Sequence, residues 1–408
     1  MTTWKPARKR CFFMHIPKTA GMTIRAALKS QYPLKETLPA ETWEELTPYK
    51  DALAKYRLFA GHFRHFFRSV LPPDTYSFTF LRDPARRTLS HLNHLIADPG
   101  FGDVHYLARG RDIRSLIEDS QVISRCSNTQ VAYLSKPRVP LTEALLRRHL
   151  PAENDFVGES DLESALENLS TLSFVGFYES LQTDFARTCD ELGLHPPSVL
   201  PVRNSARERS QSTDVSEEIL GMLRNVNRLD YLLMEKARQT YQVAKAMELP
   251  REARCLALLK RGVYQVINEP VEFRMTDPLP AIGVWQQEVT NGAAFRWTGP
   301  DPNLIFELPL NAELTYRFEL AIACPNPVGP LTAFVDGRQT CIELKTLNSR
   351  VATIEIPLAP KPDAAITRVE LRCARTLRPE PKDVRKLGFV ISKAILHPSN
   401  PAEAPLPR

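Results

Sequence analysis

The sequence predicts two domains, an α/β domain with a largely parallel sheet flanked by helices and, after it, an all-β sandwich. The chain has 408 residues, about twice the usual span of one domain. Residues 1–250 alternate short apolar runs with helical stretches, as βα units do. From about residue 276 the apolar period is two, and no helical stretch interrupts it. We therefore expect an α/β domain at 1–255, a linker at 256–275, a β-sandwich at 276–396 and a disordered tail at 397–408.

Four short apolar runs are the expected strands of the α/β domain. They are CFFMHI at 11–16, RLFAG at 57–61, YSFTFL at 76–81 and SFVGF at 173–177. Helical spacing predicts helices near 22–30, 140–150, 178–193 and 214–246. The last of these has one apolar stripe, which we expect to face the core, formed by Leu220, Leu223, Val226 and Leu229.

The C-terminal half carries the patterns of strands and hairpins. The segment ELTYRFEL alternates apolar and polar residues, which places four apolar side chains on one face, those of Leu314, Tyr316, Phe318 and Leu320. Asp336 and Gly337 lie between two apolar runs and predict a tight hairpin turn. Short strands joined by such turns are typical of a β-sandwich.

Composition narrows the classes of protein to consider. The net charge of +6, with 43% hydrophobic and 25% charged residues, fits a globular protein with an anionic small ligand and is low for a nucleic-acid-binding protein. The 7 cysteines are scattered and lack metal-ligand spacing, so we expect no disulfide framework and a reducing compartment. No apolar run reaches the roughly 18–20 residues of a membrane span. These features predict a cytoplasmic protein without a transmembrane segment.

The most informative stretch is MHIPKTAGMTI at 14–24, where a strand runs through a loop into a helix. Free backbone N–H groups and the helix dipole favour an anion at such a junction. Lys18 adds a positive charge, Gly21 permits close approach of the backbone, and the Thr19 and Thr23 hydroxyls add donors. The order Gly-x4-Gly-Lys-Ser/Thr is absent, so this is not a Walker A loop. A loop that only ends a strand and caps a helix would share these features.

A second strand ends in charged residues within FTFLRDPARRTLSHLNHL at 78–95. Asp83 is placed to cap a helix that begins at Pro84. Arg82 then lies at the carboxyl end of the strand, and Ser90 falls one turn after Arg86 on the helix. An arginine fork with a hydroxyl suits a second phosphate group. For Arg86 and its neighbour Arg87 themselves, we expect a solvated helix face.

The two stretches together resemble the paired signature of sulfotransferases that use 3′-phosphoadenosine 5′-phosphosulfate (PAPS). They are most similar to the carbohydrate group, which includes heparan and chondroitin sulfotransferases and many bacterial relatives. The resemblance implies a P-loop-like fold with PAPS as the donor. It implies 5′-phosphosulfate contacts from Lys18, Thr19, Ala20, Gly21, Met22 and Thr23, and 3′-phosphate contacts from Arg82 and Ser90.

The chain departs from the usual Lys-Thr-Gly-Gly-Thr of that family at Ala20 and Met22. Ala20 is nearly neutral if its backbone φ is negative. Two later segments also resemble the family, CSNTQVAYLS at 126–135 and SFVGFYESLQ at 173–182, so that the likeness covers residues 10–245. We expect Glu179 in the latter segment to be structural, as a partner for a loop amide or a basic residue, with a catalytic role as the lesser alternative.

Transfer to an alcohol requires a base, and histidine is best matched to neutral pH. His62 follows a short strand and Gly61, at the edge where α/β active sites form. The family resemblance favours the same residue, with His65 as the alternative. His91 and His94 have no metal-ligand partners at useful spacing, so we expect them to pack. His15 precedes the loop, and we expect it to support the shape of the loop.

These observations predict an enzyme that moves a sulfuryl group from PAPS to an acceptor hydroxyl, with Lys18 and His62 as catalytic residues and no metal. A saccharide acceptor follows from the resemblance alone. Two other interpretations stay open, a nucleotide kinase and a non-catalytic nucleotide-binding scaffold. Arg203 and Arg207 either close over a ligand or lie in a solvated loop. Three aromatic residues of the sandwich could stack on a sugar, but we expect them in its core: Trp285, Phe295 and Trp297.

Overall fold

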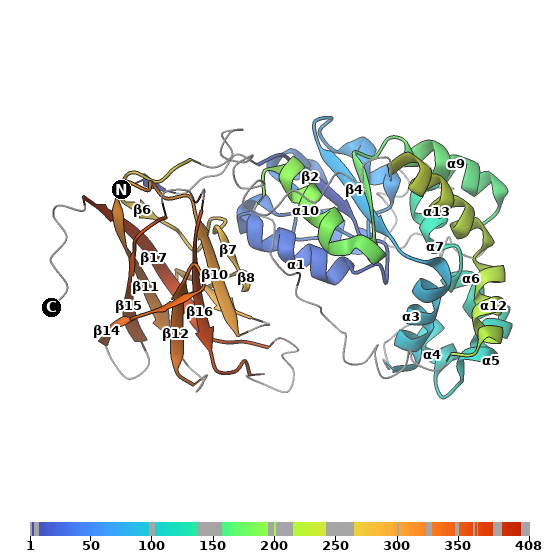
Figure 1. Cartoon of the computed structure of the whole chain (residues 1–408). Helices are drawn as coiled ribbons and strands as arrows, with labels where there is room; N and C mark the ends of the chain where they lie inside the picture. Colours follow the sequence, from blue (N-terminus) through green and yellow to red (C-terminus); the bar gives the residue numbers. More distant parts are fainter. Residues whose placement is uncertain are drawn as a thin grey trace.

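The structure of the chain is a computed structural model with two domains, drawn in Figure 1. It describes residues 2–3, 8–97, 103–136, 157–194, 200, 215–241, 265–299, 302–323, 329–346, 351–361, 364, 366–377 and 386–400. The helix expected at 140–150, Arg203 and Arg207 lie outside the described residues. Among the described residues, no helix is long and apolar enough to cross a membrane.

The α/β domain is built on a parallel sheet of four strands, ordered β3-β2-β4-β5. The strands are β2 (Cys11–Met14), β3 (Leu58–Gly61), β4 (Tyr76–Leu81) and β5 (Phe174–Phe177). All three pairings are parallel, and the four predicted strands are confirmed. Because every strand runs the same way, the four carboxyl ends meet at one edge of the sheet.

Both faces of this sheet are covered, which explains why its strands are apolar throughout. The β2 residues alternate between two cores, with Phe13 in one and Phe12 in the other. The Phe13 face packs against α1 (Gly21–Gln31) and α10 (Leu181–Leu192). The Phe12 face packs against α7 (Thr129–Leu134), α9 (Glu159–Leu169) and α13 (Arg228–Tyr241).

The remaining helical elements extend the α/β domain at its sides. They are η1 (Leu34–Glu36), α2 (Trp43–Leu46), η2 (Thr47–Lys55), η3 (His65–Val70), α3 (Pro84–Ala97), α4 (Asp103–Ala108), α5 (Ile113–Glu118), α6 (Ser120–Cys126), η4 (Tyr178–Ser180) and α12 (Glu217–Val226). The single helix expected at 214–246 is two helices, α12 and α13, because the chain leaves helical geometry at Asn227. Of the predicted stripe, Leu223 and Leu229 are buried, while Leu220 and Val226 are partly exposed.

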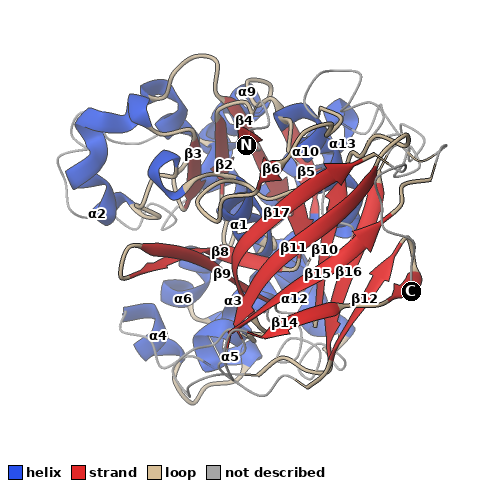
Figure 2. Cartoon of the chain, turned by 90° about the vertical axis from the view of Figure 1, so that its left-hand side faces the viewer, coloured by secondary structure: helices blue, strands red, loops and turns tan. Residues whose placement is uncertain are grey.

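The C-terminal domain consists of two sheets that are antiparallel except for one short edge pair. The larger has the path β1-β6-β17-β11-β15-β14 with the hairpin β8–β9 joined to β17, and the smaller has the order β13-β12-β16-β10-β7. Their bounds are β1 (Thr2–Thr3), β6 (Val271–Glu272), β7 (Ala281–Ile282), β8 (Val284–Thr290), β9 (Ala293–Thr298), β10 (Asn303–Leu308), β11 (Thr315–Ala323), β12 (Leu331–Val335), β13 (Arg338–Thr340), β14 (Glu343–Thr346), β15 (Val351–Leu358), β16 (Thr367–Cys373) and β17 (Val390–Ser399). Figure 2 shows these strands with the β8–β9 hairpin projecting from them.

One apolar core joins the two sheets of this β-domain. Phe306 of β10 meets Phe318 of β11 edge to face at 4.9 Å between ring centroids. The alternation predicted for ELTYRFEL is confirmed, since Tyr316, Phe318 and Leu320 are buried in that core. The predicted hairpin turn is confirmed as well, with Asp336 at φ 48° and Gly337 at φ 80° between β12 and β13.

The limits of the β-domain are wider than the sequence predicts. The stretch 256–275, expected as a linker, contributes β6, which pairs with β17, and Ile267, which bridges to Leu310. The expected tail begins inside β17, which extends to Ser399; residues 401–408 lie outside the described part. The chain also starts in this domain, because β1 pairs in parallel with β6.

Candidate functional site

Polar residues follow each of the four parallel strands at their shared edge. The loop 15–20 follows β2, His62 follows β3, Arg82 follows β4, and Tyr178 follows β5. The chain passes from β2 to a neighbour on one side and then returns to β4 on the other. The space between the ends of β2 and β4 is therefore the switch point at which open α/β sheets bind ligands.

The loop before α1 has two non-glycine residues in left-handed backbone geometry. Lys18 has φ 70° and Ala20, which is the N-cap of α1, has φ 68°. The replacement of glycine by Ala20 was expected to have little effect if the φ of Ala20 were negative. Its φ is positive, so the substitution is not neutral. Such a geometry is about 1–2 kcal/mol less favourable for an L-residue. It is the geometry that a glycine at this position would adopt without strain, and it shapes the loop around the first amides of α1.

Two loop residues have roles that differ from those expected. The Thr19 hydroxyl is fully buried and donates to the Ile16 carbonyl at 2.9 Å, so it faces the protein, not a ligand. Any contribution of Thr19 to an anion comes from its backbone. We expected Gly21 to permit approach of a ligand, but its open side is filled by the His15 ring, which a Cβ there would overlap. His15 thus supports the loop, as predicted.

Arg82 joins the end of β4 to the loop after β2. Its Nη1 donates to the Lys18 carbonyl at 3.0 Å, and its guanidinium lies 4.2 Å from the centroid of the Tyr178 ring. Its Nε is buried and has no hydrogen-bond partner among the described residues. A buried donor without a partner is unfavourable unless something binds it. Arg82 therefore has an unsatisfied donor next to the loop.

The backbone of Arg82 is fixed by a side chain from α7. The fully buried Gln130 accepts from the Arg82 amide at 2.9 Å and donates to the Arg82 carbonyl at 3.0 Å. Glu179 accepts from the amide of Asp83 at 2.9 Å, which confirms its expected structural role. Asp83 caps α3 by accepting from the Arg86 amide at 2.8 Å, as predicted. Sequence reasoning noted the segment containing Gln130 but did not find this function.

His62 lies beside the loop with its ring stacked on that of His15, at 4.1 Å between centroids. Its Nδ1 is 2.9 Å from the His15 carbonyl. Because a carbonyl only accepts, Nδ1 carries the proton and Nε2 holds the basic lone pair. Burial lowers the pKa of His62 below its usual 6.5, so the ring is neutral near pH 7. The side chain nevertheless keeps partial exposure to solvent.

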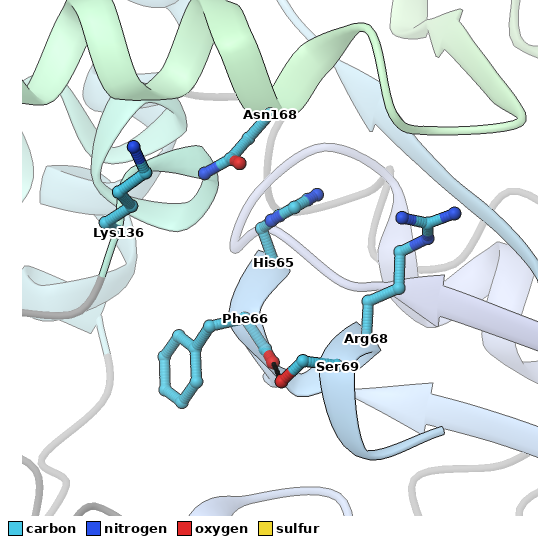
Figure 3. A pocket seen from close by; sticks show the side chains of 6 residues that line it. All are labelled: His65, Phe66, Arg68, Ser69, Lys136 and Asn168. Atoms are coloured by element: carbon cyan, nitrogen blue, oxygen red, sulfur yellow. Dashed lines mark hydrogen bonds between the residues drawn. The ribbon is translucent and has the colours of Figure 1, made fainter. Parts of the chain in front are cut away.

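The alternative base, His65, faces another part of the molecule. Its Nε2 lies 2.7 Å from the Thr171 hydroxyl, and burial lowers its pKa to about 4. It lines a hollow of about 260 Å³ with five further residues, shown in Figure 3: Phe66, Arg68, Ser69, Lys136 and Asn168. Lys18, His62 and Arg82 do not line this hollow. The geometry thus separates the two histidines.

The α3 helix carries three residues discussed above, two arginines that we expected to be exposed and a serine that we expected to contact a phosphate. Arg86 is exposed, as expected, but Arg87 is fully buried and donates to the Thr88 hydroxyl and the Cys126 carbonyl. The expectation of a solvated Arg87 was wrong, since its guanidinium finds its acceptors inside the domain. Burial lowers the pKa of Arg87, and the nearby buried Asp230 partly offsets this. Ser90 is buried on the same helix, and its contact with a phosphate stays a prediction.

In the described part of the chain, no group of three or more His, Cys, Asp or Glu side chains could hold a metal ion. Burial lowers the pKa of His91 well below 6.5. The expectation that His94 packs was wrong, because His94 is exposed, with its ring meeting that of His105 edge to face at 5.8 Å. Met22 is exposed at the start of α1. The expectation that three aromatic residues lie in the core of the β-domain holds only in part, since Trp285 is buried but Phe295 and Trp297 are partly exposed.

Comparison with known proteins yields no family. No family model matches the chain, and no curated protein matches it. A solved structure described as "CBM4 structure and function" is similar over 32% of this chain and 90% of its own, at 13% identity and a TM-score of 0.20. Another, "A novel family GH115 4-O-Methyl-alpha-glucuronidase, BtGH115A, with specificity for decorated arabinogalactans", covers 77% of this chain at 11% identity and a TM-score of 0.21. This chain spans 38% of that structure. At such scores neither likeness carries an argument.

Proposed function

We propose that this chain is a P-loop-like sulfotransferase that moves a sulfuryl group from PAPS to the hydroxyl of an acceptor. One observation carries the proposal. The contact of 3.0 Å between Arg82 and the Lys18 carbonyl joins the two segments that we propose bind the anions, at the switch point of the sheet. A neutral histidine, His62, lies beside them with its basic nitrogen free of the backbone contact. This arrangement suits a donor with two separated anionic groups and an acceptor with a proton to lose.

The residues present fit the donor. The loop supplies the first amides of α1, which no side chain caps, and the positive end of the helix dipole. Lys18 supplies a positive charge to the same group. Arg82 supplies a buried Nε that lacks a partner among the described residues, and a guanidinium fork suits a phosphate. Thr23 and Ser90 are the proposed hydroxyl contacts, one at each end of the nucleotide.

In the proposed reaction, the donor supplies an activated sulfuryl group. A bond forms between the acceptor oxygen and sulfur while the bond from sulfur to the bridging oxygen of the donor breaks. His62 takes the acceptor proton at Nε2, while its Nδ1–H continues to donate to the His15 carbonyl. Lys18 offsets the negative charge that grows on the bridging oxygen, which leaves on adenosine 3′,5′-bisphosphate. The proposed acceptor is a saccharide or glycoconjugate, on the strength of the family resemblance.

Transfer of labelled sulfate from PAPS to a panel of glycans tests the proposal. His62→Gln should lower turnover by about 10²–10⁴-fold, as loss of a positioned base does, and leave binding of adenosine 3′,5′-bisphosphate unchanged. His65→Gln is the matched control and should keep the wild-type rate. Binding of the bisphosphate without transfer to any acceptor would favour a scaffold. Phosphoryl transfer from ATP would favour a kinase.

A further inference from the structure

A fully buried arginine lies where the β-domain meets the α/β domain. Arg296 belongs to β9, and the three nitrogens of its guanidinium donate to four backbone carbonyls. Three belong to the β-domain: Met275 at 3.0 Å, Asp277 at 2.8 Å and Trp285 at 3.4 Å. The fourth is the carbonyl of Ser30 at 3.0 Å, in the last turn of α1. One cation is therefore shared between the two domains.

The Ser30 carbonyl is at the carboxyl end of α1. The amino end of α1 follows the loop at residues 15–20, which we call the anion loop. A cation at a helix carboxyl end is stabilising because it complements the helix dipole. A second arginine acts at the same end, since Arg8 donates to the Gln31 carbonyl at 2.8 Å. In Figure 1, α1 lies on the side of the α/β domain that faces the β-domain, next to β7 and β8. The view in Figure 2 agrees, with β8 in front of α1.

We propose that Arg296 fixes the β-domain to α1. The β-domain then supports the anion loop through this helix and does not move independently of the α/β domain. Arg296 is then a positioning residue that acts on the loop through α1. The inference concerns the coupling of the two domains, and it does not depend on which anion the loop binds.

The coupling follows from the burial of the charge. Burial lowers the pKa of Arg296 to about 10, which leaves the guanidinium charged near neutral pH. If the domains separated, Nη1 would keep only its longer 3.4 Å contact with the Trp285 carbonyl, and the Ser30 carbonyl would lose its charged donor. Hydrogen bonds to charged groups contribute more to stability than neutral ones. The closed arrangement is thereby favoured, and α1 is held at its carboxyl end.

Hydrogen exchange of the full chain, followed by mass spectrometry, tests this coupling. In Arg296→Met, the amides of the last turn of α1 should exchange at least about tenfold faster than in the wild type. Arg296→Lys keeps the charge but not the fork, and it should give a smaller increase. Arg338→Met is the matched control, because Arg338 is exposed in the same domain, and it should leave α1 unchanged. The strands β10 and β16 should stay protected in all three variants.

Unchanged exchange in α1 of a folded Arg296→Met protein would overturn the proposal. If that variant does not fold, Arg296→Lys decides, and exchange in α1 at the wild-type rate overturns the proposal there too. A second arm adds adenosine 3′,5′-bisphosphate, which should slow exchange in β8 of the wild type but not of Arg296→Met. Failure of the bisphosphate to bind the wild type would count against the proposed function, while the exchange rates without ligand still decide the coupling.

Discussion

The two domains differ in where they place unusual backbone geometry. In the described part of the β-domain, the non-glycine residues with positive φ are Asn291 and Asp336, and each precedes a glycine in a hairpin turn. Asn-Gly and Asp-Gly are the sequences that such turns favour. In the described part of the α/β domain, Lys18, Ala20 and Asn128 adopt the same geometry outside such a turn. Asparagine tolerates this geometry, whereas lysine and alanine rarely adopt it. Backbone strain that the local sequence does not explain is typical of functional sites. In this chain, such strain occurs in the loop before α1.

Of the three changes in stability predicted here, Gly21→Ala should cause the largest, because Gly21 lies directly after the irregular loop and in close contact with the His15 ring. A Cβ there would overlap the His15 ring, which is buried and stacked on His62. We expect a loss of about 1–3 kcal/mol in the free energy of unfolding, as for overpacked sites. Urea denaturation measures this loss. The matched control is Gly221→Ala in α12, where a Cβ meets open space and should stabilise by about 0.5–1 kcal/mol. Equal effects of the two changes would contradict the tight contact.

The pH dependence of stability should show the cost of burying His65 in the α/β domain. Burial lowers its pKa to about 4 from the usual 6.5. The unfolded chain therefore binds this proton first as the pH falls below 6.5, and stability decreases from there down to about pH 4. Between about pH 7 and pH 5 this group should account for a loss of roughly 2 kcal/mol.

Urea denaturation at both pH values measures that loss. His65→Gln, which can still bond to Thr171, should lose correspondingly less stability on acidification than the wild type. Parallel losses in the two proteins would mean that His65 is not held neutral in the fold.

Ala20→Gly should give the smallest effect, and its sign is the informative part. Glycine adopts a φ of 68° without strain, so this substitution should stabilise by about 0.5–1 kcal/mol. Ala27→Gly, in the interior of the same helix, should instead destabilise by about 1 kcal/mol. Thermal unfolding of both variants measures the difference. Destabilisation by Ala20→Gly would show that the loop is not strained at this residue.

Sequence patterns predicted the elements whose signals are local. The four strands, the Asp336-Gly337 turn and the cap at Asp83 follow from apolar period and turn chemistry. The gathering of Lys18, His62 and Arg82 at one edge follows from strand direction, which the βα alternation implies.

Contacts between distant segments could not be predicted in the same way. Gln130 contacts Arg82 across 48 positions of the chain, and Arg296 contacts Ser30 across 266. Long basic side chains are usually exposed, so the burial of Arg87 and Arg296 has no signal in the local sequence. Only the tertiary arrangement of acceptors around each guanidinium determines it. The limits of the β-domain were missed for a related reason, because the short β1 and β6 strands are defined by their pairing.

Calorimetric titration with adenosine 3′,5′-bisphosphate and with adenosine 5′-monophosphate tests the central claim most directly, which is that two anion-binding elements meet at the ends of β2 and β4. The bisphosphate should bind the wild type roughly 100-fold more tightly, about 2.7 kcal/mol. Arg82→Met should remove most of that difference, whereas Arg86→Met, at an exposed neighbour, should preserve it. Equal affinity of the wild type for the two nucleotides, or binding of neither, would contradict the account.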